Sequence, residues 1–120
     1  MSATASSRLE ELQAALQRFN IEREWGQFHG VKNLSMALAS EVGELVAVLR
    51  WLPPDAAERA KLDPQALGKL EDELGDVLLV LLTLGQRLDI DLLEVAERKL
   101  RKNAEKYAVE TSRGRSDPAC

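Results

Sequence analysis

Apolar residues recur at helical spacing along most of the chain, and this pattern predicts four helices. In the first segment four apolar residues lie three or four positions apart: Leu9, Leu12, Leu16 and Phe19. That spacing places them on one face of a helix. Because Ser7 and Glu10 have the spacing of a capping box, we expect this helix to begin at Ser7 and to end near Glu24.

Prolines mark the limits of the next two helices. The second is expected from about Lys32 to Leu52, where Pro53 stops it. The third is expected to begin with Asp63 as its N-cap and Pro64 at its first position, and to end near Leu88.

The second half of this third helix, residues 77–84 (VLLVLLTL), is apolar on every side. A helix of this kind has to be covered all round, and a small chain has few helices to cover it. We therefore expect the chain to form a homo-oligomer.

The fourth helix is expected from about Asp91, which has capping-box spacing to Glu94, to Tyr107. Residues 1–6 and 109–120 have no hydrophobic period and are expected to be irregular tails. The prediction is an all-α fold: one domain over residues 1–120, with an ordered four-helix bundle over about 7–108.

Composition narrows the function classes. The chain is rich in Leu and Ala and carries a formal net charge of −4, which excludes a uniformly basic surface for nucleic acid. No apolar run is long enough to cross a bilayer, so we expect no membrane partner. Because Cys120 is the only cysteine, an intrachain disulfide is excluded, and a cytoplasmic location is expected.

Four carboxylates lie where apolar residues are expected. At about 100° per residue, Glu41 falls inside the apolar stripe of the second helix, with Glu44 beside it. In the third helix, Glu73 and Asp76 lie on a line that continues into the apolar run. Four carboxylates in a protein interior cannot all stay ionised without positive charge nearby.

A bound cation would supply that charge. An all-oxygen ligand set suits Mg²⁺ or Mn²⁺, whereas a di-iron bundle needs more histidines than the single His29. The alternative is a network of ion pairs between the helices, with Arg50, Lys69 or Arg87 as the cations.

Five separated motifs resemble a known family. They are ERxWxQFHxxxNLxxAL at residues 22–38, EVGEL at 41–45 with Trp51 after it, EDELGDVL at 71–78, IDL at 90–92 and KxxxNxxKY at 99–107. Together they are similar to the MazG-like all-α nucleoside triphosphate pyrophosphohydrolases, and most similar to the dCTP pyrophosphatase branch.

This resemblance implies Mg²⁺-dependent hydrolysis of the α–β phosphoanhydride of a nucleoside triphosphate by a dimer or tetramer. It also implies that Glu41, Glu44, Glu73 and Asp76 bind the metal. We predict that Glu41 is the general base, since its position is the more enclosed one.

The resemblance further implies phosphate and sugar contacts for Lys99, Asn103 and Tyr107, which lie one helical turn apart. The alternative is a solvated basic face, with Tyr107 packed on the core.

For the nucleobase the resemblance implies a pocket formed by four residues: Trp25, His29, Asn33 and Trp51. Three of these have a plainer interpretation, since Trp51 can anchor a helix end, His29 can bond to the backbone of its loop and Asn33 can cap the second helix.

Two positions depart from the dCTP branch, in which some relatives carry a Tyr where this chain has Val80 and a polar ring where it has Leu16. The predicted function is hydrolysis of dCTP or a modified dCTP. The alternatives are a broad NTP or dUTP pyrophosphatase and, from another class, a non-catalytic helical oligomer that binds a protein partner.

Overall fold

The computed structural model describes residues 5–116, and all regular structure in that range is helical, which confirms that the fold is all-α. Five α-helices and two short 3₁₀ helices occur in the order α1 (Ala5–Glu22), η1 (Trp25–Phe28), α2 (Val31–Leu49), η2 (Pro54–Ala57), α3 (Pro64–Leu88), α4 (Leu92–Lys106) and α5 (Val109–Ser112). The chain divides into two compact units, one ending at Leu88 and one beginning at Asp89.

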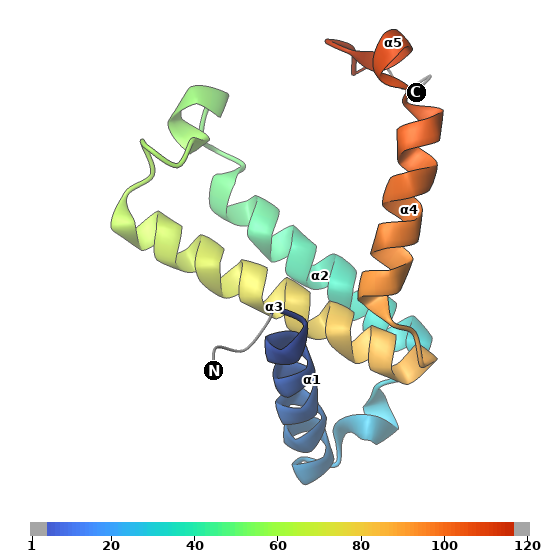
Figure 1. Cartoon of the computed structure of the whole chain (residues 1–120). Coiled ribbons are helices and arrows are strands. Elements are labelled where there is room, and N and C mark those ends of the chain that lie inside the picture. The colour runs from blue at the N-terminus through green and yellow to red at the C-terminus, as the bar shows by residue number, and fades with distance from the viewer. Residues whose placement is uncertain (1–4, 117–120) are drawn as a thin grey trace. The chain divides into compact units, whose positions relative to one another are not determined.

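In the first unit α2 and α3 form an antiparallel pair joined through η2, and α1 packs against α3 (Figure 1). Their shared core consists of buried leucines from all three helices: Leu16, Leu34, Leu70 and Leu82. A hydrogen bond of 2.8 Å from Gln86 Nε2 to the carbonyl oxygen of Gln13 also ties α3 to α1. This packing holds α2 and α3 side by side along the faces that carry the predicted carboxylates.

The turn between α1 and α2 positions Trp25. Glu24 adopts the left-handed region, with φ of 53°, and its N–H donates to the carbonyl of Ile21. This conformation has a steric cost for a residue other than glycine, and it turns the chain away from the path of α1. The 3₁₀ helix η1 follows at once and begins with Trp25.

Two of the predicted helix starts are confirmed by their hydrogen bonds. Asp63 precedes α3, and its Oδ1 accepts from the N–H of Ala66 at 2.7 Å. Asp91 caps α4 by accepting from the N–H groups of Leu93 and Glu94. In both cases a carboxylate satisfies N–H groups that the helix itself leaves unpaired.

Two other boundaries differ from the prediction. Ser7 lies inside α1, which already begins at Ala5, so the predicted cap at Ser7 is wrong. Helix α2 ends at Leu49, because the chain turns there through a bond from the N–H of Leu52 to the carbonyl of Leu49. That turn precedes Pro53, which disfavours helix in the residue before it.

The second unit contains α4 and α5. We expected an irregular chain after Ala108, but Val109–Ser112 form the short helix α5. The N–H groups of Thr111 and Ser112 both donate to the carbonyl of Ala108, and this local pairing is sufficient for one helical turn. The expected tail at residues 1–4 and 117–120 lies outside the described residues.

Several large apolar side chains of α2 and α3 remain exposed, among them Val46 and Leu74, which are 54% and 56% exposed. None of the helices between residues 5 and 116 is long and apolar enough to cross a membrane.

Candidate functional site

Three of the predicted carboxylates come together between α2 and α3. One oxygen from each of Glu41, Glu73 and Asp76 lies within 4.8 Å of the other two. Glu41 is on α2, and the other two are one turn apart on α3, so the antiparallel pairing of the helices brings them together. Glu44, one turn after Glu41, is exposed, but its carboxyl group interacts with those of Glu41 and Glu73.

The electrostatics of this cluster favour protonated carboxyl groups. Burial, and after it the neighbouring carboxyl groups of Glu44, Asp76 and Glu73, together raise the pKa of Glu41 to about 7. The pKa of Glu73 is also raised, first by burial and then by Glu44 and Asp76. Without added positive charge, repulsion between these groups therefore opposes full ionisation of the cluster.

The ion-pair alternative finds no support between residues 5 and 116. Neither Arg50, Lys69 nor Arg87 forms a salt bridge with the cluster there. Arg50 instead lies over the ring of Trp51, 4.9 Å from its centroid.

A divalent cation fits the cluster better. The Oε2 atoms of Glu41 and Glu73 are buried and have no hydrogen-bond partner among the described residues. Buried oxygens of this kind are costly unless something pairs with them, and a donor set made only of carboxylate oxygens suits Mg²⁺ or Mn²⁺.

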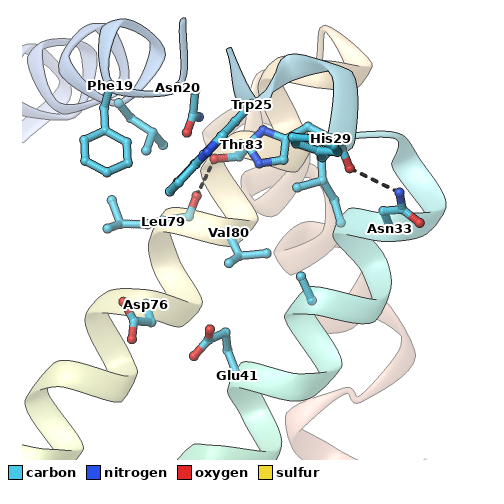
Figure 2. Close-up of a pocket in the computed structure, with 14 residues that line it drawn as sticks. Phe19, Asn20, Trp25, His29, Asn33, Glu41, Asp76, Leu79, Val80 and Thr83 are labelled. Carbon is cyan, nitrogen blue, oxygen red and sulfur yellow. Dashed lines mark hydrogen bonds between the residues drawn. The ribbon is translucent and has the colours of Figure 1, made fainter. Parts of the chain in front are cut away.

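The cluster opens onto a cavity of about 360 Å³ between α1, η1, α2 and α3. Glu41 and Asp76 lie at one end, and Trp25, His29 and Phe19 lie toward the other (Figure 2). The remaining wall is mostly apolar. This volume is within the range of pockets that bind small molecules.

Edge-to-face contacts hold the aromatic end of the cavity in place. The ring of Trp25 meets that of Phe19 at 5.5 Å between centroids and 74° between planes. It meets the ring of His29 at 6.3 Å and 71°. Contacts of this geometry are favourable and fix the orientation of the indole.

Asn33 lines the same cavity but does not cap α2, whose N-cap is Gly30. Its Nδ2 donates instead to the carbonyl oxygen of Phe28 at 3.2 Å, which ties the loop to the first turn of α2 (Figure 2). Three of the four residues predicted for the base pocket, Trp25, His29 and Asn33, therefore line one cavity.

The fourth does not, because Trp51 follows the end of α2, is 82% exposed and lies outside the residues that line the cavity. Lys99, Asn103 and Tyr107 belong to the second unit. There the N–H of Tyr107 donates to the carbonyl of Asn103, and Lys106 Nζ lies 5.3 Å from the centroid of the Tyr107 ring.

Several residues that line the cavity were not predicted as site residues, among them Phe19, Asn20, Leu79 and Thr83. For Thr83 a signal exists, since it is the single polar residue in the apolar run 77–84. Phe19 was assigned to the core stripe of the first helix, and nothing in the sequence distinguishes Asn20 from an ordinary surface residue.

Comparison with known proteins adds the family. Residues 29–108 match the MazG nucleotide pyrophosphohydrolase domain. The chain belongs to the MazG family. The members of that family are enzymes, the nucleotide pyrophosphohydrolases. The matched range includes all four predicted metal-binding residues, Glu41, Glu44, Glu73 and Asp76.

Relatives agree with this assignment. The MazG chain is 34% identical over 113 residues to dCTP pyrophosphatase 1 of Bos taurus, covering 94% of this chain and 67% of the bovine protein. It is 36% identical to dCTP pyrophosphatase 1 of Mus musculus, covering 88% of this chain and 62% of that protein. It thus spans about two thirds of the length of these relatives.

The fold of the MazG chain also has a solved counterpart. A crystal structure of a pyrophosphatase from Archaeoglobus fulgidus DSM 4304 is similar, with a TM-score of 0.79 and 32% identity. The likeness covers 90% of this chain and 99% of that one.

Proposed function

We propose that this MazG chain hydrolyses a nucleoside triphosphate, preferably dCTP or a modified dCTP, to the monophosphate and pyrophosphate. The observation that supports this most strongly is the carboxylate cluster at one end of a cavity whose other end is aromatic. A triphosphate needs cations at one end and its base needs ring surfaces at the other, and the cavity offers carboxylates that can bind a cation and aromatic rings.

The proposed metal ligands are Glu41, Glu44, Glu73 and Asp76. Their carboxylates provide the negative charge and the oxygen ligands that Mg²⁺ requires. Bound Mg²⁺ would neutralise charge on the triphosphate as the α-phosphorus is attacked. Mn²⁺ has the same preference for oxygen and is the expected substitute.

We assign the role of general base to Glu41. It belongs both to the cluster and to the cavity wall, and unlike Asp76 it is partly buried. In this role it accepts a proton from the attacking water while the new bond from oxygen to the α-phosphorus forms. The bond from the α-phosphorus to the bridging oxygen breaks, and pyrophosphate leaves with the electron pair.

At the aromatic end, Trp25 is proposed to stack on the base, with His29 and Asn33 shaping the pocket. Base stacking on an aromatic side chain contributes about 1–3 kcal/mol. Lys99, Asn103 and Tyr107 are proposed to contact phosphate and sugar on the basis of the family resemblance. A base contact of Trp51 is proposed on that basis alone, since Trp51 lies outside the cavity.

For the whole protein we propose one four-helix domain over residues 1–120, which assembles into a dimer or a tetramer in the cytoplasm. The exposed apolar side chains of α2 and α3 support assembly, because water-exposed apolar area of this kind is commonly covered by a partner.

A substrate panel tests the proposed function. Purified protein is incubated with individual NTPs and dNTPs and Mg²⁺, and pyrophosphate and orthophosphate are measured separately. We expect pyrophosphate from dCTP, and we expect Glu73→Gln to abolish it. Glu71→Gln is the matched control, since Glu71 is exposed on the same helix and lies outside the cluster.

The alternatives give different results in this assay. Similar turnover of many substrates would indicate a broad NTP or dUTP pyrophosphatase. Absence of pyrophosphate with every substrate would contradict the enzyme and favour a non-catalytic helical oligomer.

A further inference from the structure

Thr83 places a polar group in the mostly apolar wall of the cavity. It lies on α3 beyond Val80, where its cavity neighbours include Leu16, Phe19 and Leu79, and only 8% of its surface is exposed. In a mostly apolar pocket, the few polar groups determine which ligand is bound.

The hydroxyl hydrogen of Thr83 is already used. Its Oγ1 donates to the carbonyl oxygen of Leu79 at 2.8 Å, one turn earlier in the same helix (Figure 2). Since a hydroxyl has one hydrogen and two lone pairs, Thr83 can only accept a hydrogen bond from a ligand.

Another polar side chain of the wall, that of Asn20, has no such restriction. Asn20 lines the same cavity, and its amide forms no hydrogen bond within residues 5–116 that would fix its orientation. An amide offers two donors and an acceptor, so a rotation of Asn20 lets it pair with either kind of base edge. It therefore cannot discriminate between an amino and a keto group.

Thr83 and Asn20 also border a second, smaller cavity of about 200 Å³, and His29 is the third residue that the two cavities share. These polar groups thus lie at the far end of the main cavity from Glu41 and Asp76 (Figure 2). A base whose phosphates are held at the carboxylate end would meet them with its edge.

We propose that Thr83 is a specificity-determining residue that accepts a hydrogen bond from an exocyclic amino group of the nucleobase. This inference rests on the proposed function, because that function places the base in this cavity. A keto group at the same position would set two acceptor oxygens against each other in an apolar site, which is costly. The cavity would then select cytosine over uracil at the amino position.

The test compares kcat/KM for dCTP and dUTP in the wild type and in Thr83→Val. Valine has nearly the same shape as threonine but no acceptor. We therefore expect the kcat/KM for dCTP divided by the kcat/KM for dUTP to fall roughly tenfold. Thr83→Ser retains the acceptor and is expected to keep the wild-type preference.

Thr111→Val is the matched control. Thr111 also donates its hydroxyl hydrogen to a backbone carbonyl, that of Ala108, but it is exposed and lies outside both cavities. We expect no change in the ratio for this variant, and thermal unfolding of all variants checks that they are folded.

The inference is overturned if Thr83→Val keeps the wild-type ratio, or if Thr83→Ser loses it to the same extent. Should the wild type release no pyrophosphate from any substrate, the proposed function fails separately. Calorimetric titration with dCMP and dUMP then decides the question for Thr83. Equal affinities of the wild type for the two, or no binding of either, would reject the inference.

Discussion

The buried Oε2 atoms of Glu41 and Glu73 lie beside other carboxyl groups and have no hydrogen-bond partner in the described part of the chain. Helical periodicity alone predicted that these residues would face protein, because the angle per residue in a helix is fixed. The sequence could not indicate that Glu44 would remain exposed or that Trp51 would lie outside the cavity. Both depend on how neighbouring elements pack.

At the same scale, Asn20 and Thr83 could not be placed at the cavity from the sequence. Asn20 looks like an ordinary residue of its helix, and Thr83 stands out only as the single polar residue of the run 77–84. The cavity exists only because α1 packs against α3. Trp25, His29 and Asn33 were found because they belong to a motif, and the structure brings all three to the same cavity.

Glu41 gives a prediction about pH. The pKa of its carboxyl group is about 7 in the folded protein and 4.5 without that environment. The folded state therefore binds the proton more tightly, and this contribution to stability is complete below pH 4.5 and is lost as the pH rises through 7. In EDTA we expect the free energy of unfolding to decrease over this range, as measured by urea denaturation.

The side chain of Glu41→Gln has no titrating proton. Its free energy of unfolding should therefore decrease clearly less with rising pH than that of the wild type. Saturating Mg²⁺ should also make the free energy of unfolding of the wild type less dependent on pH, because a cation bound at the cluster would stabilise its ionised form. Identical pH dependence of the wild type and Glu41→Gln in EDTA would contradict this interpretation of the site.

Trp25 gives a second prediction at the residue scale. If its ring stacks on the base, Trp25→Ala should lower kcat/KM by about tenfold or more, in line with the loss of about 1–3 kcal/mol. Trp25→Phe should recover most of the activity because it keeps a ring. Steady-state kinetics with dCTP measures both, and equal activity of Trp25→Ala and the wild type would remove Trp25 from the base pocket.

At the scale of elements, the starts of α3 and α4 were predictable, because their caps are local interactions within three residues. The start of α1 was not predicted correctly. Ser7 and Glu10 have the spacing of a capping box, but the helix already begins at Ala5, so a pattern of residue types did not distinguish a cap from a helix interior.

Helix α3 carries the core of the first unit, which gives a prediction about stability. Leu82 is 2% exposed, and Leu82→Ala should lower the free energy of unfolding by about 2–5 kcal/mol through lost burial and the cavity left behind. Leu100→Ala on α4, where the side chain is 70% exposed, is the matched control. Chemical denaturation showing similar losses for both variants would mean that α3 does not form the core described here.

At the scale of the whole molecule, family membership was recognisable from the sequence because five motifs keep their order along the chain. The structure shows how three of these motifs come together. The motifs at 41–45 and 71–78 lie on α2 and α3, whose pairing assembles the carboxylate cluster, and the first motif includes η1 and the aromatic end of the cavity.

The central claim is that water attacks the α-phosphorus of a nucleotide held between the carboxylate cluster and the aromatic end of the cavity. Hydrolysis of dCTP in water enriched with heavy oxygen tests it most directly, with the products analysed by mass spectrometry. We predict that the label enters dCMP, that pyrophosphate carries none, and that Glu73→Gln forms neither product. Label in pyrophosphate, or release of orthophosphate in its place, would contradict the account.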